Sequence, residues 1–258
     1  MPRKRPHKSQ FSVRLRNLWL PIIAGLIIIF IIFLLARTLS RPARIKPETV
    51  TELKKIDLNA YTSMLGEIRI DTSLPVLFSP ELCRQLLSID TMIANRELRD
   101  AIARLNKIYH KRNTLEKALL HGYTGFCYHE LAQPANALTE FKKGIALLET
   151  VPGLTSVRIL RWLAFNTGYL FQYFSYPESA RNYYRQSVKA LAITGQFSPE
   201  FAGALFNNLG VALELLGDTL EAKNAYLQAA GYIDTTADTP QVRKLKTNIH
   251  RLGKKYQP

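Results

Sequence analysis

The hydrophobic pattern of the chain begins with one long apolar run. No residue from 17 to 36 is charged, and the 19 residues Leu18 to Ala36 are apolar apart from one proline and one glycine. At about 1.5 Å per residue a helix of this length spans roughly 28 Å, the thickness of a bilayer's hydrocarbon core. A cleaved signal peptide is the alternative, but its apolar core usually has about 7 to 15 residues and precedes a small-x-small cleavage site. The run therefore predicts a retained transmembrane signal-anchor over residues 17–36.

The pattern changes twice after this run. Residues 37–78 are mixed, and Pro42 and Pro47 interrupt any helix near their start, so we interpret the segment as a linker or stalk. Ile68 and Ile70 give a brief strand-like alternation, which leaves the structure of this segment open. From residue 79 to residue 258 the apolar positions follow a helical period, which predicts an all-α domain.

Within this domain, three glycines mark a repeat. Each glycine is followed twelve residues later by an alanine and, four residues after that, by a large aromatic residue. The glycines are 43 and 42 residues apart. These repeat-packing residues are Gly125, Ala137 and Phe141, then Gly168, Ala180 and Tyr184, then Gly210, Ala222 and Tyr226.

This register resembles that of the tetratricopeptide repeat (TPR), a helical hairpin with small residues at positions 8 and 20 and a bulky one at position 24. The family's period is about 34 residues, and the surplus here falls in VPGLTSVR and TGQFSPE, which indicates lengthened helices or loops between hairpins. The resemblance implies a short TPR-like helical-hairpin solenoid, preceded by one transmembrane helix. We expect hairpins at about 80–110, 114–150, 156–194 and 199–234, and a closing helix at 240–256.

Charge bears on topology rather than on fold. The chain has a formal net charge of +15, and residues 1–16 form a basic tail with six cations and no acid. Residues 37–51 hold four cations, so the bias places the N-terminus in the cytoplasm and the C-terminal domain on the extracytoplasmic side, which is the periplasm in a bacterium. This gives a single-pass protein of the inner (plasma) membrane. The tail also suits contact with anionic lipid, and we expect no nucleic-acid partner.

The sequence lacks the patterns of known catalytic sites. It has no GxxxxGK[ST], GxSxG, HExxH or CxxC. The best metal candidate is the group His121, Cys127 and His129, but on a helix the last two point about 200° apart, so a buried thiol and a groove-facing imidazole are favoured. Cys83 and Cys127 are expected to be thiols. We therefore predict no enzyme activity, cofactor, metal or small-molecule substrate.

The repeat register also predicts a binding surface. In the resembled fold, the first helix of each hairpin lines a concave wall, whose aromatic residues offer contact area and whose asparagine amides can bond to the backbone of an extended peptide. Packing between hairpins is the alternative for each single aromatic residue. The predicted partner-binding residues are Phe126, His129, Trp162, Asn166, Tyr169, Tyr173, Asn207, Asn208 and Val211.

These expectations favour a membrane-anchored protein-interaction adaptor that binds a segment of another protein in its groove. The alternative is a structural assembly subunit of a membrane or cell-envelope complex, which would use the same repeats and its transmembrane helix as contacts. An enzyme built on residues 37–78 is disfavoured, because so short a segment cannot bury an independent core.

Overall fold

The computed structural model describes residues 62–255 except 67–69, 72 and 196. All of them belong to the second of two compact units, Thr51–Pro258. The predicted basic tail, the predicted transmembrane helix at 17–36 and the linker up to residue 61 lie outside the described residues. Among the helices that the structure does describe, none is long and apolar enough to cross a membrane.

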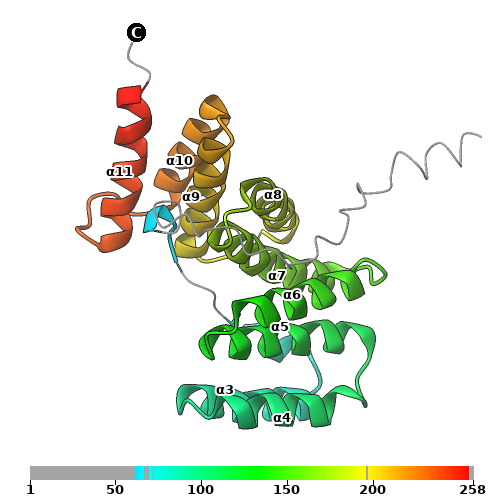
Figure 1. The fold of residues 1–258 in the computed structure, drawn as a ribbon. Coiled ribbons are helices and arrows are strands. Elements are labelled where there is room, and N and C mark those ends of the chain that lie inside the picture. The colour runs from blue at the N-terminus through cyan, green and yellow to red at the C-terminus, as the bar shows by residue number, and fades with distance from the viewer. Residues whose placement is uncertain (1–61, 67–69, 72, 196, 256–258) are drawn as a thin grey trace, which may run out of the picture. The chain divides into compact units, whose positions relative to one another are not determined.

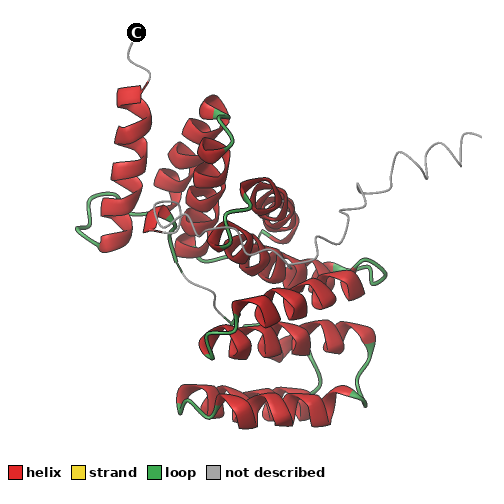
Figure 2. Cartoon of the chain, in the orientation of Figure 1, coloured by secondary structure: helices red, strands yellow, loops and turns green. Residues whose placement is uncertain are grey.

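The described part is all-α, and its consecutive helices pack as pairs (Figures 1 and 2). The main contacts join α5 to α6, α7 to α8 and α9 to α10, and neighbouring pairs meet through α6 with α7 and α8 with α9. This is the arrangement of a helical-repeat solenoid. The elements are η1 (Pro75–Leu77), α3 (Pro80–Ala94), α4 (Leu98–Tyr109), α5 (Thr114–Glu130), α6 (Pro134–Leu148), α7 (Leu154–Tyr173), α8 (Pro177–Thr194), α9 (Pro199–Leu215), α10 (Thr219–Tyr232) and α11 (Pro240–Lys255).

Local sequence signals account for where these helices start. The side chains of Ser79 and Ser198 each accept a hydrogen bond from the third backbone N–H after them, and a proline follows each serine at the first helical position. Asn113 and Glu116 form a reciprocal capping box at the start of α5. Prolines also open α6, α8 and α11. These signals fix the hairpin boundaries independently of the repeat register.

The three repeat glycines lie where the two helices of a pair come closest. A Cβ atom built on Gly125 would stand 2.7 Å from the Phe141 ring, and one on Gly168 would stand 2.8 Å from the Tyr184 ring. At Gly210 the distance to the Tyr226 ring is 2.6 Å. The alanines at the second small position, Ala137, Ala180 and Ala222, are fully buried. In each hairpin, therefore, an aromatic ring of the second helix packs directly against a glycine of the first helix, where a larger residue would clash with the ring.

The last helix, α11, closes the C-terminal end of the stack. Its apolar side chains, Val242, Leu245 and Leu252, are buried. The guanidinium of Arg251 donates two hydrogen bonds, of 2.8 and 2.7 Å, to the carboxylate of Glu214 on α9. A bidentate pair of this kind fixes orientation as well as distance, so α11 has a defined rotation against α9.

Parts of the segment that the sequence indicated as linker pack on the repeats. We call residues 62–66 the strap. Met64 and Leu65 of the strap, and Leu74 after it, are buried, and the strap lies beside α9 and α11 (Figure 1, cyan). Met64 and Leu65 are buried beside helices more than a hundred residues away in sequence, as their contacts with Tyr184 and Asn208 show. The helical domain thus includes chain that precedes α3, of which Thr62 and Ser63 are themselves helical.

The glycine–aromatic contact generates a stability prediction. Replacing Gly210 with alanine should lower the free energy of unfolding by about 1–3 kcal/mol, because the buried Tyr226 ring has no room to move. The matched control is Gly231→Ala in α10, where an added Cβ meets nothing within 4 Å. That variant should gain about 0.5–1 kcal/mol from helix propensity. Urea unfolding measures both, and equal stabilisation by the two variants would contradict the close crossing.

Candidate protein-binding groove

Asn208 holds the main chain of the strap at two points. The Leu65 N–H donates to Asn208 Oδ1 at 2.7 Å, and Asn208 Nδ2 donates to the Leu65 carbonyl oxygen at 3.0 Å. A carboxamide has the same donor and acceptor as a peptide group, so Asn208 pairs with Leu65 much as an adjacent β-strand would. Both bonds are buried. The contact recognises the main chain of Leu65, which lies just after the helical residues Thr62 and Ser63, whatever its side chain.

Neighbouring side chains extend this contact to two more carbonyl groups. Asn207 Nδ2 and Asn248 Nδ2 both donate to the Ser63 carbonyl oxygen at 3.1 Å. Lys244 Nζ donates to the Met64 carbonyl oxygen at 3.3 Å. Three consecutive carbonyl groups of the strap, at residues 63, 64 and 65, therefore each accept a hydrogen bond from a side chain of α9 or α11.

The three asparagine side chains also form hydrogen bonds with one another. Asn248 Nδ2 donates to Asn207 Oδ1 at 2.8 Å, and Asn207 Nδ2 donates to Asn208 Oδ1 at 3.2 Å. All three side chains are buried, at 0 or 1% exposure. A buried amide costs free energy unless it is hydrogen-bonded. The three amides satisfy this requirement only jointly with the strap, so the strap completes a polar network in the groove.

Apolar burial accompanies the polar contacts. Met64 and Leu65 are each 1% exposed, and full burial of such a side chain is worth about 1.5–3 kcal/mol. The hydroxyl of Tyr184 donates to Met64 Sδ at 3.7 Å. Burial raises the pKa of Tyr184 above its usual value, and nearby Tyr169 adds to the effect. The hydroxyl thus stays protonated and available as a donor to the strap.

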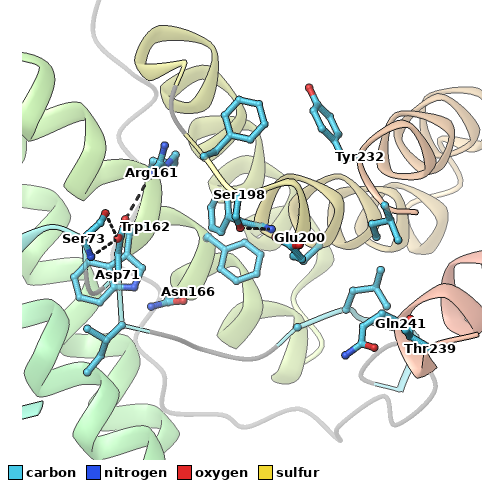
Figure 3. Close-up of a pocket in the computed structure, with 18 of the residues that line it drawn as sticks. Asp71, Ser73, Arg161, Trp162, Asn166, Ser198, Glu200, Tyr232, Thr239 and Gln241 are labelled. Atoms are coloured by element: carbon cyan, nitrogen blue, oxygen red, sulfur yellow. Dashed lines mark hydrogen bonds and ion pairs between the residues drawn. The ribbon is translucent and has the colours of Figure 1, made fainter. Parts of the chain in front are cut away.

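A pocket of about 760 Å³ adjoins the strap between α7, α9 and the α10–α11 connection (Figure 3). That volume is in the range of small-ligand and peptide side-chain sites. Aromatic rings from α7 and α9 form much of its wall, and the strap residues Leu65 and Gly66 form its edge. Its lining residues include Trp162, Phe165, Asn166 and Phe201.

One wall of the pocket is fixed by an ion pair. Arg161 Nη2 lies 3.4 Å from Asp71 Oδ2 (Figure 3). Arg161 Nη1 donates to Thr194 Oγ1 at 3.1 Å. The guanidinium also lies 5.4 Å from the centre of the Phe201 ring. Desolvation lowers the pKa of Arg161, opposed by Asp71. An arginine remains charged after such a shift, so this pair ties the chain at residue 71 to α7.

The structure divides the predicted groove residues into three groups. Asn207 and Asn208 hold the strap, whereas Trp162 and Asn166 line the pocket. Tyr169 and Val211 are buried in the domain. The remaining three, Phe126, His129 and Tyr173, are half-buried and line neither the strap contact nor the pocket. Their role as partner-binding residues stays a prediction.

Sequence reasoning missed several residues of the groove. Asn248 and Lys244 lie on α11, which we expected only to close the stack, and Phe201 and Arg161 belong to the pocket. One signal could have found Asn248. It follows Asn208 by 40 residues, nearly the 42 residues that separate Asn166 from Asn208, so asparagine recurs at corresponding places on three successive first helices.

The candidate metal group is not assembled. His121 bonds through its two ring nitrogens to Tyr109 at 3.1 Å and to Glu140 at 2.6 Å, and no cluster of three metal-ligating residues occurs in the part of the chain that the structure describes. Cys83 and Cys127 are free thiols. Burial, with a contribution from nearby Glu130, raises the pKa of Cys127 to about 12. This thiol is protonated at neutral pH and is a poor nucleophile.

Comparison with known proteins leaves the fold without a family assignment. No protein-family model and no curated protein matches the chain. The helical-repeat architecture therefore rests on the packed helix pairs and their glycine register.

The asparagine contact generates the second prediction. Asn208→Ala removes both hydrogen bonds to Leu65 and leaves a buried N–H and a buried C=O unpaired, so the free energy of unfolding should fall by about 2 kcal/mol or more. The control is Asn182→Ala on the exposed face of α8, which should change it by less than about 0.5 kcal/mol. Urea unfolding monitored by circular dichroism measures both. Indistinguishable midpoints would show that the strap contact carries no stability.

Proposed function

We propose that this protein is a membrane-anchored adaptor of the TPR type that binds a segment of a partner protein in the groove between α7, α9 and α11. The observation that supports it best is the row of hydrogen bonds from asparagine and lysine side chains to three consecutive carbonyl groups of the strap. A wall that holds a polypeptide by its main chain has the chemistry that an adaptor for partner segments needs.

Two further features support the TPR type and the anchor. The glycine, alanine and aromatic residues of the repeat lie at the helix crossings, where the family's small and bulky positions would lie. The apolar run at 17–36 and the basic tail before it favour an anchor with its N-terminus in the cytoplasm. In this proposal the repeat domain works on the extracytoplasmic side of the membrane.

In this proposal, main-chain contacts and pocket contacts have different roles in recognising the partner. Hydrogen bonds to peptide groups supply affinity without selecting a sequence, whereas side-chain pockets select. The pocket beside the strap has an aromatic wall formed by Trp162, Phe165 and Phe201. It suits one large apolar or aromatic side chain of the partner, which makes the pocket the specificity element of the groove.

A second function, a structural assembly subunit of a membrane or cell-envelope complex, is supported by the strap itself. Strap residues already occupy the asparagine-lined part of the groove. If they never leave, partners must contact the outer helices and the predicted transmembrane helix instead. The two functions differ in whether the groove or the anchor carries the partner contact.

Site-specific photo-crosslinking in native membranes tests the adaptor. A photoreactive residue in place of Phe201, at the pocket, should give one discrete adduct with a partner polypeptide. The control position is Leu220 on α10, which is 74% exposed and does not line the pocket. Equal adducts from both positions, or adducts from Leu220 alone, would contradict groove binding.

Removal of residues 1–36 separates the two functions. The adaptor should still form the Phe201 adduct when the truncated protein is mixed with solubilised membranes, because its groove is intact. An assembly subunit that needs its transmembrane contact should lose the adduct. Crosslinking yield, normalised to the amount of protein, is the measurement.

Topology is a separate prediction. A reporter enzyme that is active only outside the cytoplasm, fused after Pro258, should be active, because the cation bias places the C-terminus across the membrane. A reporter that is active only in the cytoplasm, fused at the same point, is the control. Activity of the cytoplasmic reporter alone would reverse the proposed orientation.

A further inference from the structure

The strap has the features of a bound peptide ligand. It places two adjacent apolar side chains, Met64 and Leu65, in buried positions, and its carbonyl groups are bonded by side chains of the groove. At Gly66 the backbone turns with a φ of +69°, a conformation that favours glycine. An added Cβ there would lie 3.4 Å from the Cβ of Ala204 on α9, so the chain at this point lies directly against the helix.

The hydrogen bonds of the groove use main-chain atoms, which every polypeptide offers. The bonds that the asparagine and lysine side chains make to the strap each join a side chain of α9 or α11 to a main-chain atom. The groove therefore recognises a main chain that leaves a helix at Ser63 and offers the carbonyl groups of the next two residues, and the buried positions of Met64 and Leu65 select for two apolar side chains. Nothing in this set of contacts requires the segment to belong to the same molecule.

We propose that the groove binds in trans a partner segment with the pattern of the strap, two adjacent apolar residues followed by glycine, and that the strap competes with this segment in cis. The inference rests on the proposed adaptor function and specifies its ligand. It also makes the strap a built-in competitor, which sets how strongly a partner must bind.

Competition by a tethered segment has a predictable size. A segment joined by a short flexible linker acts at an effective concentration of about millimolar. A free peptide with the same contacts then binds the intact protein far more weakly than a protein whose strap has been weakened. A natural partner overcomes the strap through contacts that the strap does not use, and the adjoining pocket with Trp162, Phe165 and Phe201 offers them.

A synthetic peptide tests this inference with the full-length chain in detergent. The probe is a fluorescent peptide with the sequence of residues 58–71, LNAYTSMLGEIRID. The protein variant is Met64→Ala with Leu65→Ala, which weakens the strap and leaves the groove side chains in place. Fluorescence anisotropy should show at least about tenfold tighter binding of the probe to this variant than to the unchanged protein.

Two controls assign the binding to the groove. Adding Asn208→Ala to the strap variant should weaken binding of the probe about tenfold or more, because the two-point contact with the backbone is lost. A probe with serine in place of its methionine and its second leucine should not bind. If the native probe fails to bind a strap variant that is folded by circular dichroism, or binds equally with and without Asn208, the inference is overturned.

A reversible disulfide between the strap and α9 tests the inference if the strap variant does not fold. Gly66→Cys with Ala204→Cys, in a chain with Cys83→Ser and Cys127→Ala, brings two Cβ atoms to about the separation of a disulfide. The oxidised protein should exclude the native probe, and reduction should restore weak binding. Equal binding before and after reduction would overturn the inference. Either failure leaves the adduct at Phe201 as an independent test of the adaptor.

Discussion

The structure depends on the close approach of paired helices at three glycines. Because Gly210 must face Tyr226 on α10, Asn208, which lies two residues earlier and about 200° around the helix, must face away from that partner. The same constraint places Asn166 relative to Gly168. The residues that close each hairpin therefore also decide which side chains form the groove, and the polar wall is a consequence of how the helices pack.

The sequence predicted the features that follow this periodicity. The helix pairs from α5 to α10 lie within a few residues of the expected hairpins, since glycine spacing, caps and prolines are local signals. The same register predicted Asn207 and Asn208 as partner-binding residues. Their side chains bond to the main chain of the strap, and partner binding there stays a prediction. The membrane anchor is a prediction on residues that the structure does not describe.

The strap could not be predicted, because its contacts are long-range and its pattern is too short. Leu65 and Asn208 are 143 residues apart, and two adjacent apolar residues have no period that distinguishes strand, helix or loop. The hydrogen bonds from Asn248 and Lys244 to the strap depend on how α11 packs beside α9, which no local pattern predicts. A segment whose sequence predicts a linker can thus complete a binding site. The buried amides of Asn207, Asn208 and Asn248 require hydrogen-bond partners, and the main chain of the strap provides them.

The most direct test of this account is amide hydrogen exchange at Leu65 in the full-length protein, measured by nuclear magnetic resonance. The Leu65 N–H donates to a buried oxygen of Asn208, so its exchange should be slowed by a factor approaching that of the amides in the middle of α9. The same amide in the Asn208→Ala variant should exchange much faster, while the amides of α5 keep their protection. Exchange of Leu65 at nearly the rate of an unfolded peptide in the unchanged protein would contradict the central claim that the groove holds the strap.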